Sequence, residues 1–176
     1  YGAWPDDYDE IKRGVRRLLD RKKSLEDRLS EHRETVYTAT MRRLLDNNLP
    51  PGNATLSMLR SLQFPVEARS VHAVAIRLYD RVTSTPRESV ENLQIQQSVL
   101  LDSLERIPDT AAHAYSADRL VLLVFDRQEE ELRAMLSRLA ENLARRGHTN
   151  IRMGVGGAVA ALTDVHRSCA EAWQAL

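Results

Sequence analysis

Cysteine, aromatic residues and long apolar runs are scarce in this chain. The single Cys169 excludes an internal disulfide framework and a cysteine-based zinc site. No apolar run approaches the roughly 20 residues that a membrane helix needs, and no signal peptide opens the sequence. The 25 basic and 25 acidic residues balance, so net charge gives no general attraction to nucleic acid or to an anionic membrane.

What remains is a globular chain of 176 residues, a length that suits one modest domain with an extension. It begins without Met and ends inside the helical pattern "AEAWQAL". We therefore expect a piece of a longer protein, truncated at its C-terminus.

The first segment, residues 1–47, is expected to be one long helix, because apolar residues recur along it in steps of three and four. The positions of this heptad seam are Tyr8, Ile11, Val15, Leu18, Lys22, Leu25, Leu29, His32 and Val36. Charged residues fill the positions between, and Lys22 and His32 interrupt the seam. A narrow stripe over about four heptads predicts a coiled coil and hence a homodimer through this helix. The alternative is a long helix that lies on its own domain.

Basic residues crowd locally in this helix, as in "KRGVRRLLDRKK", but acids are interleaved along it. We interpret the stretch as a solvated helix face and expect no direct contact with nucleic acid or membrane.

Residues 48–65 form a connector. The sequence "DNNLPPGN" ends the long helix, and a short helix, "ATLSMLRSL", follows and stops at Phe64-Pro65.

Residues 66–176 show a regular alternation of strands and helices. A strand in "ARSVHAVAIRLYD" precedes a helix over residues 85–107 with Thr85 and Glu88 as a capping box. A hairpin follows, then a helix capped by Asp126 and Glu129, a strand in "NIRMGVGGAV", and a last helix from Thr163. This order predicts an α+β fold: a ferredoxin-like antiparallel sheet with helices on one face, after the long N-terminal helix.

A ferredoxin-like plan whose hairpin "HAYSADRLVLLVFDR" bears a polar turn resembles the palm of nucleotide cyclases, specifically the diguanylate cyclase (GGDEF) family. In that family the turn reads Gly-Gly-Asp/Glu-Glu-Phe. The matching positions are Ser116, Ala117, Asp118, Arg119 and Leu120. The resemblance implies that carboxylates at the turn hold a Mg²⁺ ion that bridges the nucleotide phosphates.

This sequence departs from that pattern. The Cβ atoms of Ser116 and Ala117 obstruct a close approach of backbone to nucleotide, and Arg119 places a cation where the family needs an anion. At about 4 Å this reversal is worth several kcal/mol even with an effective dielectric constant near 20. Asp118 and Asp80, near the end of the first strand, remain as vestigial metal or nucleotide ligands. We expect no catalysis, no cofactor and no bound metal.

The family also has an inhibitory product site of the form Arg-x-x-Asp shortly before the turn. "RIPD", from Arg106 to Asp109, has this form, although the hairpin is one residue longer than the pattern requires. The resemblance implies a cyclic dinucleotide site there; the alternative is ordinary helix-stop chemistry.

A charged heptad helix that leads into a degenerate palm resembles the middle of membrane-bound AraC/XylS-family transcriptional regulators. The resemblance rests on "PDDYDEIKRGVRRLLDRKKSLEDRL", "YTATMRRLLDNNLP" and "DRLVLLVFD". It implies a non-catalytic, cytoplasmic dimerisation and relay region, with DNA bound only through a domain outside this chain. Two alternatives remain open, namely a cyclase-like domain that binds nucleotide or cyclic dinucleotide, and a plain oligomerisation module.

Overall fold

The structure is a computed structural model that describes residues 5–80, 86–146 and 150–176, with the backbone alone for residues 5–10 and residue 86. It divides into two compact units, Tyr1–Ala39 and Thr40–Leu176, and each is described by itself.

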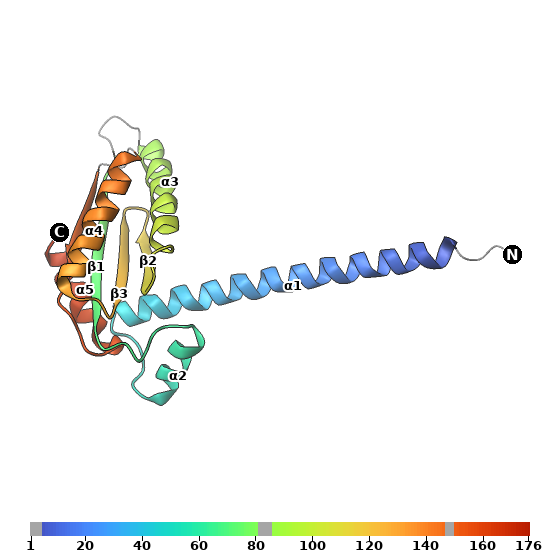
Figure 1. Cartoon of the computed structure of the whole chain (residues 1–176), viewed down its shortest axis with the longest axis horizontal. Coiled ribbons are helices and arrows are strands. Elements are labelled where there is room, and N and C mark those ends of the chain that lie inside the picture. The colour runs from blue at the N-terminus through green and yellow to red at the C-terminus, as the bar shows by residue number, and fades with distance from the viewer. Residues whose placement is uncertain (1–4, 81–85, 147–149) are drawn as a thin grey trace. The chain divides into compact units, whose positions relative to one another are not determined.

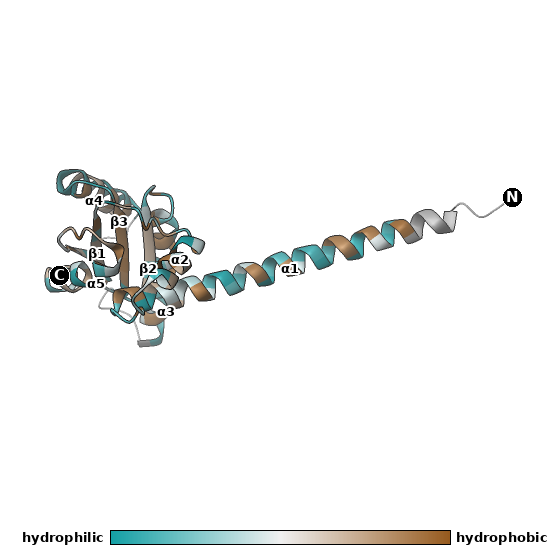
Figure 2. Cartoon of the chain, turned by 90° about the horizontal axis from the view of Figure 1, so that it is seen from below, coloured by the Kyte–Doolittle hydropathy of each residue, from teal (hydrophilic) through white to brown (hydrophobic). Residues whose placement is uncertain are grey.

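The first unit consists of most of helix α1 (Pro5–Leu45), which confirms the predicted long helix (Figure 1). Apolar residues recur along α1 between hydrophilic turns (Figure 2). The large apolar side chains that are half exposed or more in this unit are Ile11, Val15, Leu18, Leu19, Leu25 and Leu29. The helix ends where Asn47 takes a positive φ of 56° and the Asn48 N–H donates to the Arg43 carbonyl at 2.8 Å.

The second unit is a four-stranded antiparallel sheet with helices on both faces (Figure 1). Its strand order, β2-β3-β1-β4, is ferredoxin-like, and the predicted α+β fold is confirmed. The elements are α2 (Asn53–Ser61), β1 (Val71–Leu78), α3 (Pro86–Leu104), β2 (Thr110–Ser116), β3 (Arg119–Phe125), α4 (Glu129–Arg145), β4 (Ile151–Val155), a 3-10 turn (Leu162–Asp164) and α5 (Val165–Gln174).

One face of the sheet packs against α3 and α4. Alternate residues of the two central strands point to this side because side chains along a strand alternate between faces. The core there is formed by Val74, Ile76, Leu78, Leu100, Leu104, Leu120, Leu122, Val124, Leu132, Leu136, Leu139 and Leu143. In α3 the buried leucines lie in the second half of the helix, whereas Val90, which the sequence pattern places on its apolar face, is 49% exposed.

The opposite face is covered by α5, so the prediction of helices on one face alone is wrong. Small residues let this helix lie against the sheet backbone. A Cβ added to Gly156 would stand 1.9 Å from the Ser168 carbonyl oxygen, and one added to Gly154 would stand 2.2 Å from that of Ala172. The Ser168 hydroxyl oxygen also accepts the Ala73 N–H at 2.9 Å. The sequence periodicity over α5 predicts a helix but does not indicate which face of the sheet this helix covers.

The end of α1 belongs to the second unit, where Met41, Leu44 and Leu45 are buried. Leu45 lines a cavity with Cys169 and Trp173 of α5. The end of α1 and helix α5 therefore line one cavity.

The β2–β3 hairpin contains a bulge. Ala114 pairs with Leu120 and Ser116 with Arg119, so Tyr115 is the extra residue. The bulge adds one residue to β2 between its pairs with Leu120 and Arg119.

Asp126 does not cap α4, which corrects the predicted capping box. The helix begins at Glu129, after Gln128, without a side-chain cap. Asp126 has a positive φ of 51°, and its Oδ1 accepts the backbone N–H groups of Arg69 at 2.6 Å and Ser70 at 3.1 Å. A contact distant in sequence thus takes the carboxylate that the local pattern assigned to the helix. Thr85, the other predicted cap, lies outside the described residues.

Within the described ranges, no helix combines the length and the apolar character that a bilayer crossing requires.

Candidate functional site

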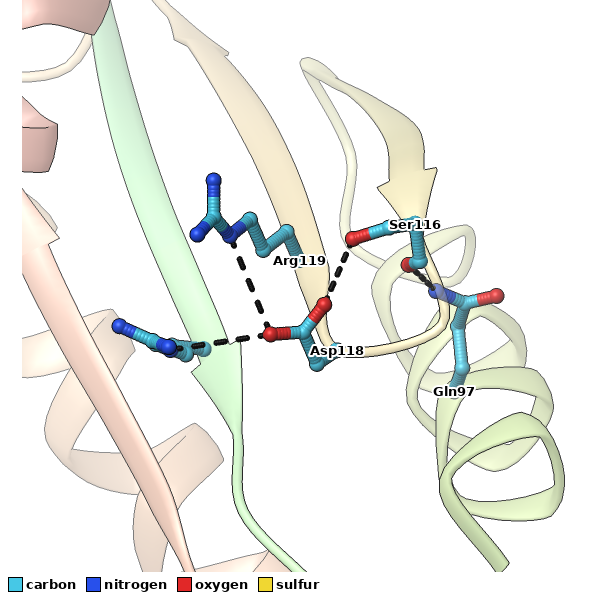
Figure 3. Close-up of polar contacts among 5 residues, drawn as sticks. Gln97, Ser116, Asp118 and Arg119 are labelled. Atoms are coloured by element: carbon cyan, nitrogen blue, oxygen red, sulfur yellow. Dashed lines mark hydrogen bonds and ion pairs between the residues drawn. The ribbon is translucent and has the colours of Figure 1, made fainter. Parts of the chain in front are cut away.

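The polar turn at the tip of the hairpin is held by its own side chains and by α3. The Ser116 hydroxyl donates a hydrogen bond to Asp118 Oδ1 at 2.6 Å, and Gln97 of α3 donates from Nε2 to the Ser116 carbonyl (Figure 3). The Asp118 carbonyl accepts the Leu78 N–H at 2.8 Å, which ties the turn to the end of β1. The turn is therefore a well-bonded corner of the sheet.

Asp118 lies between two guanidinium groups. Its Oδ2 is 3.7 Å from Nε of Arg77 on β1 and 3.8 Å from Nε of Arg119 on β3. A divalent cation bound at Asp118 would stand beside both positive charges, and each repulsion at about 4 Å costs several kcal/mol with an effective dielectric constant near 20. The electrostatics of this corner therefore favour an anion over Mg²⁺.

The two predicted vestigial acids lie at the same end of the sheet. Asp80 follows β1 and is half-buried, and Asp118 is bonded through its backbone to Leu78 at the end of that strand. In the part of the chain that the structure describes, no group of three or more His, Cys, Asp or Glu side chains is placed to hold a metal ion.

The turn does not need glycine for its backbone. Among the described residues other than glycine, positive φ angles occur at Asn47, Gln63, Asp109 and Asp126, and neither Ser116 nor Ala117 is one of them. The side chains at Ser116 and Ala117 are therefore compatible with the fold, and glycines here would serve only the close approach of a ligand.

Arg106 and Asp109, the predicted dinucleotide pair, have different surroundings. Arg106 lines a cavity of about 810 Å³ between α3 and α4. Asp109 has a φ of 59°, and its carbonyl accepts the Phe125 N–H at 3.0 Å. Arg106 thus belongs to a groove, whereas Asp109 shapes the start of β2.

That groove contains a residue that sequence reasoning missed. Arg127 donates from Nη2 to the Pro108 carbonyl at 3.1 Å, while its buried Nε has no hydrogen-bond partner in the structure. Arg138 and Arg146 line the same groove, together with Asp102 of α3 and Glu131 of α4. These arginines come from different elements, and no sequence signal distinguishes them from other surface arginines.

A second missed cluster surrounds the bulge residue Tyr115. The rings of His113 and Trp173 contact it edge-on, with centroids 5.1 and 6.4 Å away. Burial, followed by the charges of Cys169 and Asp46, raises the pKa of Tyr115 well above its ordinary value. Burial also lowers the pKa of His113 and raises that of Cys169. The cluster therefore holds its phenol, imidazole and thiol in their neutral forms.

The predicted seam lies in the first unit. Ile11, Leu18 and Leu29 are 65%, 69% and 69% exposed, which is unusual for such large apolar side chains. Lys22 is exposed and pairs with Glu26 at 3.6 Å, and His32 is exposed as well. Of the remaining seam residues, Val15 and Leu25 are exposed and Val36 is half-buried. The side chain of Tyr8 lies outside the part of the chain that the structure describes.

No curated protein matches the chain. The model of the GGDEF-like domain family does match, over residues 47–176, the range that holds α2, the sheet, the polar turn and α5. The chain therefore belongs to the GGDEF-like domain family.

Proposed function

We propose that this chain is the non-catalytic dimerisation and signal-relay region of a bacterial AraC-type transcriptional regulator. One observation carries the proposal: the same helix, α1, bears an exposed apolar seam along most of its length and buries its last turn in the GGDEF-like unit. A helix of this kind suits a region that joins two chains and passes a change in their packing onward.

The partner of the seam is a second copy of the chain. Large apolar side chains in a heptad pattern lose much of their contact with water when two such helices pair. Sedimentation of the full chain tests this: we expect a dimer. Leu18→Glu with Leu25→Glu should give a monomer, whereas the control Arg17→Glu with Ser24→Glu, placed off the seam, should leave the dimer intact. A monomer before substitution contradicts the proposal.

The absence of catalysis is supported by the arginines at the turn. Arg77 and Arg119 flank the carboxylate at which the family resemblance implies a metal ligand. We expect no cyclic dinucleotide when the chain is incubated with GTP and Mg²⁺. Product that disappears in an Asp118→Asn variant would show a working cyclase and overturn this part of the proposal.

The regulator context is supported by the linker resemblance, which covers residues 5–29 and 37–50, along α1 and just past its end. In this proposal the chain is the cytoplasmic portion of a membrane protein, with a sensor and a membrane helix before α1 and a DNA-binding helix-turn-helix pair after α5. DNA is then bound only through that later domain. The residues that flank this chain in the full gene product test the context: a gene product without a helix-turn-helix pair contradicts it.

A second candidate function is suggested by the groove between α3 and α4. Arg106 lines this cavity of about 810 Å³, and Arg127 has a buried Nε without a hydrogen-bond partner. A volume of this size fits a nucleotide or a cyclic dinucleotide, whose phosphates guanidinium groups bind well. Calorimetric titration of the chain with cyclic diguanylate, repeated with Arg106→Gln, tests this function. Micromolar binding that Arg106→Gln abolishes supports it, and an absence of heat rules it out.

A further inference from the structure

Three arginines form a row across adjacent strands of the sheet. Arg77 of β1 is the direct cross-strand neighbour of Arg119 on β3 and of Arg152 on β4. Directly paired residues point to the same face, and strands lie about 4.8 Å apart, so this arginine row spans about 10 Å. Like charges that face each other across strands destabilise a sheet. A row of three is therefore a feature that folding alone does not favour.

The arginine row is only partly neutralised. Asp118 pairs with it, through its Oδ2 at 3.7 Å from Nε of Arg77 and 3.8 Å from Nε of Arg119. Both distances are too long for hydrogen bonds, so the guanidinium N–H groups still have donors to offer. The side chains of Arg77 and Arg119 are 42% and 53% exposed. The row therefore presents an excess of positive charge to the surroundings.

Two aromatic rings hold the arginine row in place. The guanidinium carbons of Arg77 and Arg152 lie 5.3 and 5.4 Å from the centre of the Tyr79 ring, and that of Arg119 lies 5.8 Å from the centre of the Trp173 ring. Such stacking restrains long side chains before any ligand arrives and so lowers the entropy that binding would cost. Arginine, tyrosine and tryptophan are also the residue types that dominate binding energy at protein interfaces.

We propose that the arginine row is a docking surface for an acidic helical segment of a partner protein. Carboxylates three or four residues apart on a helix have Cβ atoms about 5–6 Å apart, close to the spacing of the row. Guanidinium groups bind carboxylates in a two-pronged manner. Small phosphorylated molecules bind in concave cavities that bury most of their surface. Arg119 lines such a cavity with Trp173, but Arg77 and Arg152 are not part of its lining, and Arg77 is 42% exposed at the end of the sheet. None of the three arginines belongs to the seam of α1, so the proposal does not rest on pairing through that seam.

Fluorescence anisotropy with the full chain tests the proposal. The probe is a labelled, capped, alanine-based peptide of about 18 residues with glutamates at i, i+4 and i+7; its control has glutamine at those positions. We expect the glutamate peptide to bind at least about tenfold more tightly at low salt and to weaken as salt rises. Arg152→Gln should weaken that binding about tenfold without lowering the melting temperature, because it removes one of the facing like charges. Arg167→Gln, an exposed arginine of α5 away from the row, is the matched control and should change nothing.

Four outcomes would overturn the proposal. The two peptides could bind equally, or Arg152→Gln and Arg167→Gln could have equal effects. Inorganic tripolyphosphate could bind with the same dependence on Arg152 while the glutamate peptide does not, which would assign the row to a phosphorylated ligand. Arg152→Gln could convert a dimer to a monomer, which would make a second copy the occupant. The last outcome is distinguishable from a failed seam, since the Leu18→Glu and Leu25→Glu variant reports on the seam separately.

Discussion

The Tyr115 hydroxyl donates a long hydrogen bond, 3.4 Å, to Oδ1 of Asp46, the residue that follows the end of α1. Tyr115 is also the bulge of β2, and its neighbour Ser116 bonds to the side chain of Asp118. The end of the long helix is thus connected to the polar turn through a short chain of contacts. Since a relay requires physical contacts of this kind, this pair is the first place to test one.

A double-mutant cycle on this pair should detect coupling. Tyr115→Phe keeps the ring and removes the donor, and Asp46→Ala removes the acceptor. We expect each to lower the free energy of unfolding by about 0.5–1.5 kcal/mol, with a coupling energy of about 0.5–1 kcal/mol, as measured by urea denaturation at neutral pH. Strictly additive effects would show that the contact contributes nothing.

Tyr115 should also make stability fall at alkaline pH. Burial, then Cys169 and Asp46, raise its pKa in the folded chain, so the folded state holds the phenol proton more tightly than the unfolded state does. This stabilisation is complete below about pH 10, the ordinary pKa of tyrosine, and is lost as the pH rises further. The stability difference between the natural chain and Tyr115→Phe should therefore shrink from pH 9 to pH 11 in urea denaturation. A difference that stays constant over this interval contradicts the assignment.

Much of the fold could be predicted from the sequence because periodicity reports directly on burial. The continuous apolar run from Leu120 to Phe125 is a central strand whose six residues are all buried, and the three-four spacing of α4 matches its buried leucines. Asp126 shows where such reasoning fails. Its spacing to Glu129 satisfies the local capping pattern, but the backbone of Arg69 and Ser70, distant in sequence, takes the carboxylate.

Single residues of the candidate site could be predicted from the sequence, but their arrangement across the strands could not. The sequence places Arg119 at the turn, and the structure finds it there beside Asp118. The alignment of Arg77 with Arg119 and Arg152 depends on the register of three strands, which no local pattern fixes. Arg127 was missed for the same reason, because its groove is formed by helices that meet only in the folded chain.

Gly156 should tolerate no side chain. A Cβ there would lie 1.9 Å from the Ser168 carbonyl oxygen, so Gly156→Ala must displace α5 and should lower the free energy of unfolding by more than about 2 kcal/mol. Gly14→Ala is the control. Nothing lies within 4 Å of a Cβ added at this position, and alanine is more favourable than glycine in a helix by about 1 kcal/mol, so this variant should not be destabilised. Thermal denaturation followed by circular dichroism compares the two. If the two substitutions changed the stability equally, the close contact with α5 would not be the reason for glycine at position 156.

Asp126 should matter through its side-chain oxygen. Asp126→Ala removes the acceptor for two backbone N–H groups and places alanine at a positive φ of 51°, so we expect a loss of about 2–3 kcal/mol in urea denaturation. Asp126→Asn keeps an acceptor and tolerates the left-handed conformation, and should lose less than half as much. Glu129→Ala, which would disrupt the capping box if one existed, should cost little beyond its ion pair with Arg133. A larger loss for Glu129→Ala than for Asp126→Ala would restore the capping interpretation.

Lys22 and His32 should set how firmly the two helices pair. Both are exposed polar residues at seam positions, and polar residues there weaken a coiled coil while permitting more than one packing. Replacing both with leucine adds two buried apolar side chains to each helix, so the dissociation constant of the dimer should fall by about 100-fold or more in analytical ultracentrifugation. Lys23→Leu with Glu31→Leu adds the same two leucines off the seam and should leave the dissociation constant unchanged.

In the full-length protein the variant with leucine at positions 22 and 32 should hold one packing and lose its response to signal, because a bistable element is then biased to one state. A tighter dimer with an unaltered response would separate pairing from relay and remove the polar seam positions from the mechanism.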